Sequence, residues 1–421
     1  MNPAIIALII VIVTMVLMIL DKMPLGATLM LACIAMQLTG IIKFTRVYSD
    51  FGGTTVIFLI GMLIIGNGIF DVGLAQDIGN ALFKTSLVKN ERLMIFVCTI
   101  VAGVLSAFAS NSAVIAMFIP LVAAAHVQSN GKIRQKNILM SIGMACAVGG
   151  SGTLSGSTSQ VVGQGLLEEG GYRAMTYFEM GKVAFPALVV VAIYMATIGY
   201  SLNKKFIEFN DDVDPELLPK EGQTFPKWKK WMVGIVTVLV LLGFVTGTWN
   251  IAYCALVGAA VLLATKTLDW KKSFKDVDWN TVCVLGFATA MAAGMNDSGA
   301  GKMIADWMLN LCGGTAASAT VIMIVLALLT LILTNVMSNT ATVAMLAPIA
   351  ISMAVSMGIE PISFVCPIAI ASGMAVATPI GTPCMTQSMV IGYRFKDYLI
   401  IGVPLTILLG VVLAVLCPIM Y

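Results

Sequence analysis

Two polar triplets interrupt the longest apolar runs of the chain, and their residue types are suited to binding ions. Ser110-Asn111-Ser112 divides the run 93–125, and Ser338-Asn339-Thr340 divides the run 313–358. Each triplet offers an amide, with two donor hydrogens and a carbonyl oxygen, between residues that carry hydroxyls. Neutral oxygens of this kind can hold Na⁺, and N–H and O–H groups can hold an anion. The triplets therefore indicate a binding site.

Another hydroxyl stands four positions before each triplet, at Ser106 and at Thr334. Because residues four apart share a helix face, Ser106 with Ser110, and Thr334 with Ser338, can face one cation. A helix that restarts after a triplet also points the positive end of its dipole at the same place. Packing of small polar residues between helices is the alternative, and it explains one triplet better than two in matching positions.

Two further segments break apolar runs, at 149–158 (GGSGTLSGST) and at 377–383 (ATPIGTP). Pro and Gly free backbone groups that must be satisfied inside protein or in a wet cavity. We therefore expect both breaks at the centre of the protein, facing the triplets. The glycine-rich break lacks the Gly-Lys-Ser/Thr ending of a phosphate-binding loop.

The composition indicates what surrounds these segments. Of 421 residues, 59% are apolar and only 11% are charged, and the mean hydropathy is +0.97. Soluble domains carry about 25% charged residues. The sequence thus excludes soluble enzymes, nucleic-acid-binding proteins and disordered chains, and it predicts a polytopic membrane protein in a lipid bilayer.

Enzymatic function is disfavoured, because the spans lack paired acids, a metal-binding cluster and a nucleophile with its base. His126 is the only histidine, and none of the nine cysteines forms a CxxC pair. Ionisable residues are likewise missing from the interior of the spans, where proton-coupled carriers usually have one. Coupling to a metal cation held by neutral oxygens is the better prediction.

Twelve apolar runs are long enough, or nearly long enough, to cross a bilayer at 1.5 Å per residue. They are 3–20, 24–42, 53–70, 93–125, 138–167, 183–202, 232–248, 251–265, 277–295, 313–358, 361–393 and 399–420. We interpret the two longest as re-entrant helical hairpins, 92–126 and 315–357, and predict broken helices over 138–167 and 361–391. About ten transmembrane helices then remain, and the fold class is all-α.

The distribution of Lys and Arg gives the orientation. With ten crossings, 19 of the 24 basic residues fall on one side of the membrane and 5 on the other. The basic side is cytoplasmic. Both termini are then on the outer side of the cell membrane. The first hairpin opens from the cytoplasm, and the second opens from outside. Two full crossings in place of each hairpin give the same parity and remain an alternative.

The two halves of the chain repeat each other. Residues 108–120 (FASNSAVIAMFIP) match 336–348 (VMSNTATVAMLAP) at an offset of 228. We predict a first repeat over 1–202, a cytoplasmic linker over 203–230 and a second repeat over 231–421. Each repeat has five crossings, so the two have opposite orientations. Inverted repeats with broken helices at the midplane are typical of secondary transporters.

These motifs together resemble the divalent anion/sodium symporter family of the ion transporter superfamily. The resemblance rests on the paired triplets, the two breaks, and the RFKD and GVPL segments that follow the second break, and it runs from about Gly53 to the C-terminus. It implies a homodimer with an elevator mechanism. Three features depart from the family pattern. Ser112 stands where Thr is usual, and the family's Gly-Thr-Pro-Pro-Asn continuation is replaced by Ser157-Thr158-Ser159 in the first half and by Thr382-Pro383-Cys384-Met385 in the second.

The resemblance also implies site residues. One Na⁺ site would use Ser106, Ser110, Asn111 and Gly152, and the other Thr334, Met337, Asn339 and Ala377. The anion would contact Asn111, Ser112, Thr153, Ser338, Asn339, Thr340, Thr378 and Pro379. We therefore expect sodium-coupled uptake of a small di- or tricarboxylate resembling succinate, malate or citrate. The alternative is a permease for an inorganic oxyanion such as sulfate, or an anion exchanger or antiporter of the same superfamily.

Overall fold

The computed structural model describes residues 2–20, 22–83, 90–129, 131–209, 213–218, 225–247, 249–311 and 318–421. Across these ranges every regular element is helical. Seven of the described helices are long and apolar enough to cross a membrane, and four apolar helices are shorter. The prediction of an all-α polytopic membrane protein is confirmed.

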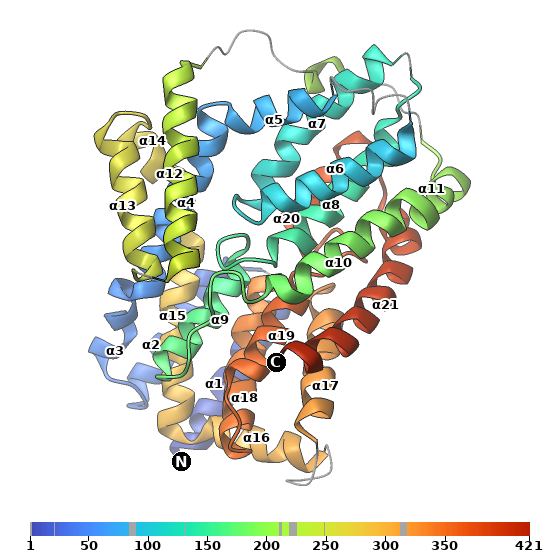
Figure 1. Ribbon diagram of the computed structural model, residues 1–421. Coiled ribbons are helices and arrows are strands. Elements are labelled where there is room, and N and C mark those ends of the chain that lie inside the picture. Colours follow the sequence, from blue (N-terminus) through green and yellow to red (C-terminus); the bar gives the residue numbers. More distant parts are fainter. Residues whose placement is uncertain are drawn as a thin grey trace.

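The helices form two groups that stand side by side in Figure 1. In the first group α4 packs on α13 and α15 packs on α2. We call it the α4–α15 group. Its members are α1 (Pro3–Leu20), α2 (Leu25–Leu38), α3 (Phe44–Ser49), α4 (Thr54–Asp71), α12 (Lys227–Thr246), α13 (Ile251–Ala264), α14 (Trp270–Lys275) and α15 (Trp279–Ser298).

The second group holds both hairpins and both broken helices, and we call it the hairpin group. Its members are α6 (Glu91–Ser106), α7 (Asn111–Gln128), α8 (Gln135–Gly150), α9 (Thr158–Glu169), α10 (Gly181–Tyr194), α11 (Tyr200–Phe206), α17 (Ala319–Leu333), α18 (Asn339–Ser356), α19 (Ile362–Ser372), α20 (Pro383–Ser388) and α21 (Phe395–Met420). A π-helical turn, Met195–Gly199, joins α10 to α11.

Two helices that lie across the molecule connect the groups. Figure 1 shows α5 (Leu74–Phe83) near the upper end and α16 (Ala300–Leu311) near the lower end. Hydropathy over long windows does not predict them, nor α3 and α14. Each of these helices is short, and α5 and α16 carry their apolar residues as a stripe on one face, which a search for continuous apolar runs passes over.

The order of elements agrees with a repeat. A long helix, a crossing helix, a hairpin, a broken helix and a final long helix follow one another as α4 to α11 and again as α15 to α21. The boundaries 1–202, 203–230 and 231–421 stay predictions. Parts of the linker, 210–212 and 219–224, lie outside the described residues, as do Lys84, Lys89 and Lys220 of the basic side.

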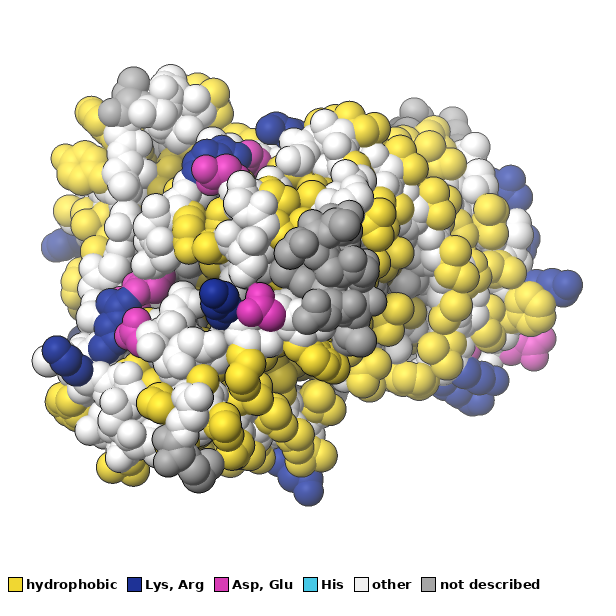
Figure 2. Space-filling view, turned by 90° about the horizontal axis from the view of Figure 1, so that it is seen from below, with side chains coloured by type: hydrophobic (Ala, Val, Ile, Leu, Met, Phe, Trp, Pro, Cys, Tyr) yellow, Lys and Arg dark blue, Asp and Glu magenta, His cyan; other side chains and the backbone are white. Residues whose placement is uncertain are grey.

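The surface is that of a protein surrounded by lipid. Large apolar side chains are exposed along the outer helices, among them Trp231, Leu239 and Val245 on α12 and Ile407 on α21. Figure 2 shows one end of the molecule, where apolar side chains cover much of the surface, some acidic and basic groups lie next to one another, and other basic groups stand apart at the edges.

Candidate functional site

The two triplets lie where a second helix of each hairpin begins. Helix α6 ends at Ser106 and α7 begins at Asn111, and the Ser110 hydroxyl caps α7 by accepting from the Ala113 amide at 3.3 Å. In the second hairpin, α18 begins at Asn339 and the Ser338 hydroxyl accepts from the Ala341 amide at 3.2 Å. A side-chain oxygen at this position satisfies a free N–H group of the first turn. N-capping therefore explains why a serine stands immediately before each of these helices.

A buried hydroxyl meets the amide of each triplet. Ser106 Oγ lies 2.5 Å from the end of the Asn111 carboxamide, and Thr334 Oγ1 lies 2.8 Å from Asn339 Oδ1. Both hydroxyl residues are fully buried. The partner five positions on, rather than the serine four positions on, is therefore the residue that each hydroxyl contacts. The two contacts occupy matching positions in the two halves.

Carbonyl oxygens complete both clusters. The same end of the Asn111 carboxamide also lies 3.2 Å from the Cys146 carbonyl and 3.0 Å from the Gly156 carbonyl. With its nitrogen at this end, the amide donates to both carbonyls and to Ser106 Oγ. Turned the other way, the amide adds an oxygen to two carbonyls and a hydroxyl. Such an all-oxygen set suits a hard cation such as Na⁺. The backbone at Gly150 makes room, because a Cβ there would stand 2.4 Å from Asn111 Oδ1.

The second cluster is also built from an amide, hydroxyls and a carbonyl, but it has two hydroxyls and one carbonyl where the first has one hydroxyl and two carbonyls. Thr334 Oγ1 lies 2.8 Å from the Ser372 carbonyl as well as from Asn339, and the Asn339 amide nitrogen donates to Thr382 Oγ1 at 3.3 Å. Asn339 is 6% exposed, so this amide is held almost entirely by protein. The described residues contain no group of three His, Cys, Asp or Glu side chains that could hold a metal ion.

The helix breaks lie against the hairpin turns. Helix α8 ends at Gly150 and α9 begins at Thr158, whereas α19 ends at Ser372 and α20 begins at Pro383. Inside the first break the Thr153 hydroxyl donates to the Ala107 carbonyl, and inside the second the Thr378 hydroxyl donates to the Asn335 carbonyl at 2.5 Å. These matching bonds tie each break to the turn of its own hairpin.

A cavity of about 430 Å³ lies between the triplets, the breaks and the α4–α15 group. Several helices begin at its wall: α7 at Asn111, α9 at Thr158, α18 at Asn339, α20 at Pro383 and, from the α4–α15 group, α2 at Leu25. A helix N-terminus presents free N–H groups and a positive partial charge. Among the described lining residues none is Lys or Arg. The one acid, Asp278, is engaged in capping α15 through the Thr281 amide at 3.2 Å.

The predicted residues divide into those on this wall and those behind it. The wall includes Ser110, Asn111, Ser112, Ser338, Asn339 and Thr340. Behind it, buried, are Ser106, Gly152, Thr153, Thr334, Met337, Ala377 and Pro379, together with the half-buried Thr378. The Ala377 amide donates to Asn335 Oδ1 at 2.8 Å. Contact of Thr153, Thr378 and Pro379 with substrate, and the ion-binding roles of the others, stay predictions.

Sequence reasoning does not select several polar residues that also line the cavity. They are Asn67, Ser155, Ser157, Thr158, Asn280 and Thr382. Ser157, Thr158 and Thr382 could have been selected from the sequence, because they lie where it departs from the family pattern, at 157–159 and 382–385. Asn67 and Asn280 give none, because they stand near helix ends, where polar residues are ordinary.

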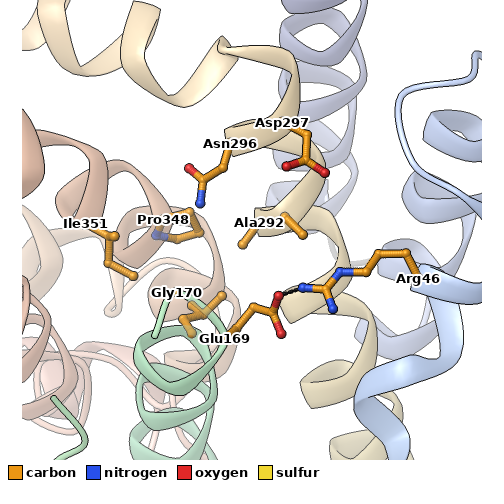
Figure 3. Close-up of a pocket in the computed structure, with 10 residues that line it drawn as sticks. Arg46, Glu169, Gly170, Ala292, Asn296, Asp297, Pro348 and Ile351 are labelled. Carbon is orange, nitrogen blue, oxygen red and sulfur yellow. Dashed lines mark ion pairs between the residues drawn. The ribbon is translucent and has the colours of Figure 1, made fainter. Parts of the chain in front are cut away.

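A second polar pocket, of about 300 Å³, lies at the other end of α9 (Figure 3). Arg46 of α3 forms an ion pair with Glu169, the last residue of α9, and Asn296 and Asp297 of α15 complete the wall. Next to it, Thr55 of α4 lies 2.5 Å from the Glu168 carboxylate. The end of α9 is thus bonded to the α4–α15 group on this side.

A family model described as citrate transporter matches residues 15–364 and 241–421. The sodium-dependent dicarboxylate transporter SdcS of Staphylococcus saprophyticus is 24% identical over 401 residues, covering 86% of this chain and 75% of the relative. SdcS of Staphylococcus aureus strain USA300 is 24% identical over 400 residues, with the same coverage.

Two solved structures share the fold. The YdaH transporter of Alcanivorax borkumensis has a TM-score of 0.59 at 14% identity, over 100% of this chain and 98% of that one. MtrF of Neisseria gonorrhoeae, described as illuminating a class of antimetabolite efflux pumps, has a TM-score of 0.63 at 13% identity, over 100% and 95%. At such identities the similarity concerns the fold alone.

Proposed function

Because the chain belongs to the citrate transporter family, we propose that it carries a small di- or tricarboxylate, similar to succinate, malate or citrate, into the cell together with Na⁺. The chain is a multi-pass membrane protein and a carboxylate transporter, not an enzyme. One observation carries the proposal of sodium-coupled uptake. Two asparagine-centred oxygen clusters and the N-termini of α7, α9 and α18 meet at one cavity without a Lys or Arg among its described lining residues.

The charge balance of this cavity supports coupling to a cation. A divalent anion loses hydration when it enters a protein at midplane depth, and hydroxyls alone offset little of that cost. Each helix N-terminus contributes about half a positive charge at most. Na⁺ ions in the clusters around Asn111 and Asn339 supply further charge next to the anion. Sodium is a coupling ion in this proposal, not a prosthetic group, and the sodium-dependent relatives support its choice.

The arrangement of the two helix groups supports alternating access by an elevator-type movement. The cavity reaches Pro24, Asn67 and Asp278, at one end of α2, α4 and α15. At the other end of α4 and α15, the last turn of α9 is bonded to Thr55 and Arg46. With the basic side as cytoplasm, this is an inward-facing state. The hairpin group would move past the α4–α15 group to open the opposite side.

We place the protein in the cell membrane with both termini outside, following the distribution of Lys and Arg. A homodimer follows from the resemblance to the divalent anion/sodium symporters alone. Its partners are then the anion, Na⁺, the lipid bilayer and a second copy of the chain.

Uptake into proteoliposomes tests the function. Labelled succinate, malate, citrate and sulfate would be offered with an inward Na⁺ gradient, with K⁺ in its place, and with a protonophore present. We expect carboxylate uptake that requires Na⁺ and withstands the protonophore. Full uptake without Na⁺ that collapses with the protonophore would overturn the coupling. Uptake of sulfate alone, or uptake that needs anion inside the vesicle, would favour the oxyanion permease or the exchanger.

A further inference from the structure

One hydroxyl pair crosses the cavity between segments 182 residues apart. Thr158 Oγ1, at the first residue of α9, lies 2.6 Å from Oγ1 of Thr340, in the first turn of α18. Both residues are half-buried and line the cavity. Thr158 lies in the segment where the sequence departs from the family pattern.

Most other hydroxyls around the triplets are already engaged. Ser110 and Ser338 cap their own helices, and Thr153 and Thr378 donate to carbonyls of the hairpin turns. Thr153 and Thr378 have therefore used their only hydrogen, whereas Ser110 and Ser338 each keep an O–H and one lone pair. Capacity for a ligand that both donates and accepts remains where an O–H and lone pairs stay available together.

The Thr158–Thr340 pair has such capacity. Two hydroxyls have two donor hydrogens and four acceptor lone pairs, and the bond between them uses one of each. Within the described part of the chain, neither makes another hydrogen bond that would use the rest. One O–H and up to three lone pairs are therefore available to a molecule in the cavity.

The unused O–H and lone pairs of the two threonines are suited to a particular class of ligand. The free O–H can donate to a carboxylate oxygen, which only accepts, whereas the lone pairs can accept only from a donor. A dicarboxylate such as succinate has no donor to offer when it is ionised. A 2-hydroxy acid such as malate, or the hydroxylated tricarboxylate citrate, has an O–H beside a carboxylate and can use both functions of the pair.

We propose that Thr158, paired with Thr340, is a specificity-determining residue that favours hydroxylated carboxylates over unsubstituted ones. This inference rests on the proposed function and narrows its substrate class. A site built to bond a substrate hydroxyl rejects the analogue that lacks it, because its own polar groups are then unpaired. Because the pair is half-buried, water can partly satisfy its polar groups when the substrate has no hydroxyl. We therefore expect a preference of about tenfold for the hydroxylated substrate.

The experiment compares Thr158→Val, which keeps the shape and removes the hydroxyl, with Thr158→Ser, which keeps the hydroxyl. KM for malate, citrate and succinate would be measured in proteoliposomes at saturating Na⁺. Wild type and Thr158→Ser should prefer malate to succinate by about tenfold. Thr158→Val should lose that preference through a rise in the KM for malate, while the KM for succinate changes by less than about threefold.

Several outcomes would overturn the inference. They are a wild type with equal KM for malate and succinate, a Thr158→Val variant that keeps the wild-type ratio, and a variant that weakens all three substrates equally. If Thr158→Val does not fold, judged by its thermal unfolding in detergent, Thr158→Ala is measured in its place. The proposed function fails separately, when the wild type itself shows no sodium-dependent carboxylate uptake.

Discussion

Thr334 Oγ1 lies 2.8 Å from Asn339 Oδ1, and the same hydroxyl lies 2.8 Å from the Ser372 carbonyl oxygen. A hydroxyl has one hydrogen and cannot donate fully to both oxygens at once. Three oxygens from a hairpin and a helix break therefore converge at a buried point, and Ser106 and Asn111 form the matching contact in the other half. A cation at such a point would be held by groups from both segments.

The Thr334 hydroxyl should govern sodium affinity. Thr334→Ala removes one oxygen of the cluster without touching the cavity wall, so the Na⁺ concentration for half-maximal uptake should rise about tenfold. Thr334→Ser keeps the oxygen and should stay within about twofold of wild type. The measurement is the dependence of succinate or malate uptake on Na⁺. An unchanged Na⁺ dependence in Thr334→Ala would remove this oxygen from the cation site.

The asparagines should be indispensable to transport but not to folding. Asn111→Ala and Asn339→Ala each leave buried partners without a hydrogen bond, at a cost of about 1–3 kcal/mol, and each removes a group proposed to serve cation and anion together. We expect transport to fall below about 5% of wild type while the protein still elutes as a single species from size exclusion. Near-normal uptake by either variant contradicts the site assignment.

Gly150 should be required for the position of Asn111. A Cβ at Gly150 would stand 2.4 Å from Asn111 Oδ1, whereas a Cβ at the exposed Gly52 meets no atom within 4 Å. Gly150→Ala should therefore displace the amide and lower the apparent Na⁺ affinity at least tenfold, and Gly52→Ala should transport as wild type does. Equal Na⁺ dependence in the two variants would show that the amide moves at no cost to binding.

The Arg46–Glu169 ion pair should help to close the side of the molecule shown in Figure 3. Its side chains are 35% and 17% exposed, so we expect a contribution of about 1 kcal/mol at most. Arg46→Gln should raise the rate at which an impermeant maleimide labels Asn296→Cys by about two- to fivefold. Arg46→Lys, which keeps the charge, is the control.

Labelling of the chain without Asn296→Cys gives the background of the native cysteines. Seven of the eight described cysteines are buried, so this background should be low. If Asn296→Cys is labelled at the same rate alone and in combination with Arg46→Gln or Arg46→Lys, the ion pair has no part in holding this side closed.

Sodium and anion binding should be cooperative. If the cations neutralise the anion, each must tighten the other by the same factor, because linkage is reciprocal. Calorimetric titration of malate at rising Na⁺ should show affinity increasing at least tenfold, with the reciprocal effect on Na⁺. A malate affinity that stays flat from zero to saturating Na⁺ would mean that positive charge comes from groups other than Na⁺.

Composition and local motifs are sufficient to predict the class of protein and the segments of the site. Low charge and long apolar runs leave lipid as the only suitable surroundings, so the all-α membrane fold was predictable and is confirmed, as is the family, which the matched triplets and breaks identified. The position of a helix start after Ser110 or Ser338 is likewise local, because N-capping involves neighbouring residues only.

The contacts between distant segments, in contrast, are visible only in the folded molecule. Thr158 and Thr340 are 182 residues apart, and no periodicity in the sequence brings their hydroxyls to 2.6 Å. The same holds for Arg46 and Glu169, and for Thr153, whose hydroxyl donates to the Ala107 carbonyl behind the cavity wall. Such contacts depend on how whole helices pack, and packing sums many weak interactions that no single motif encodes.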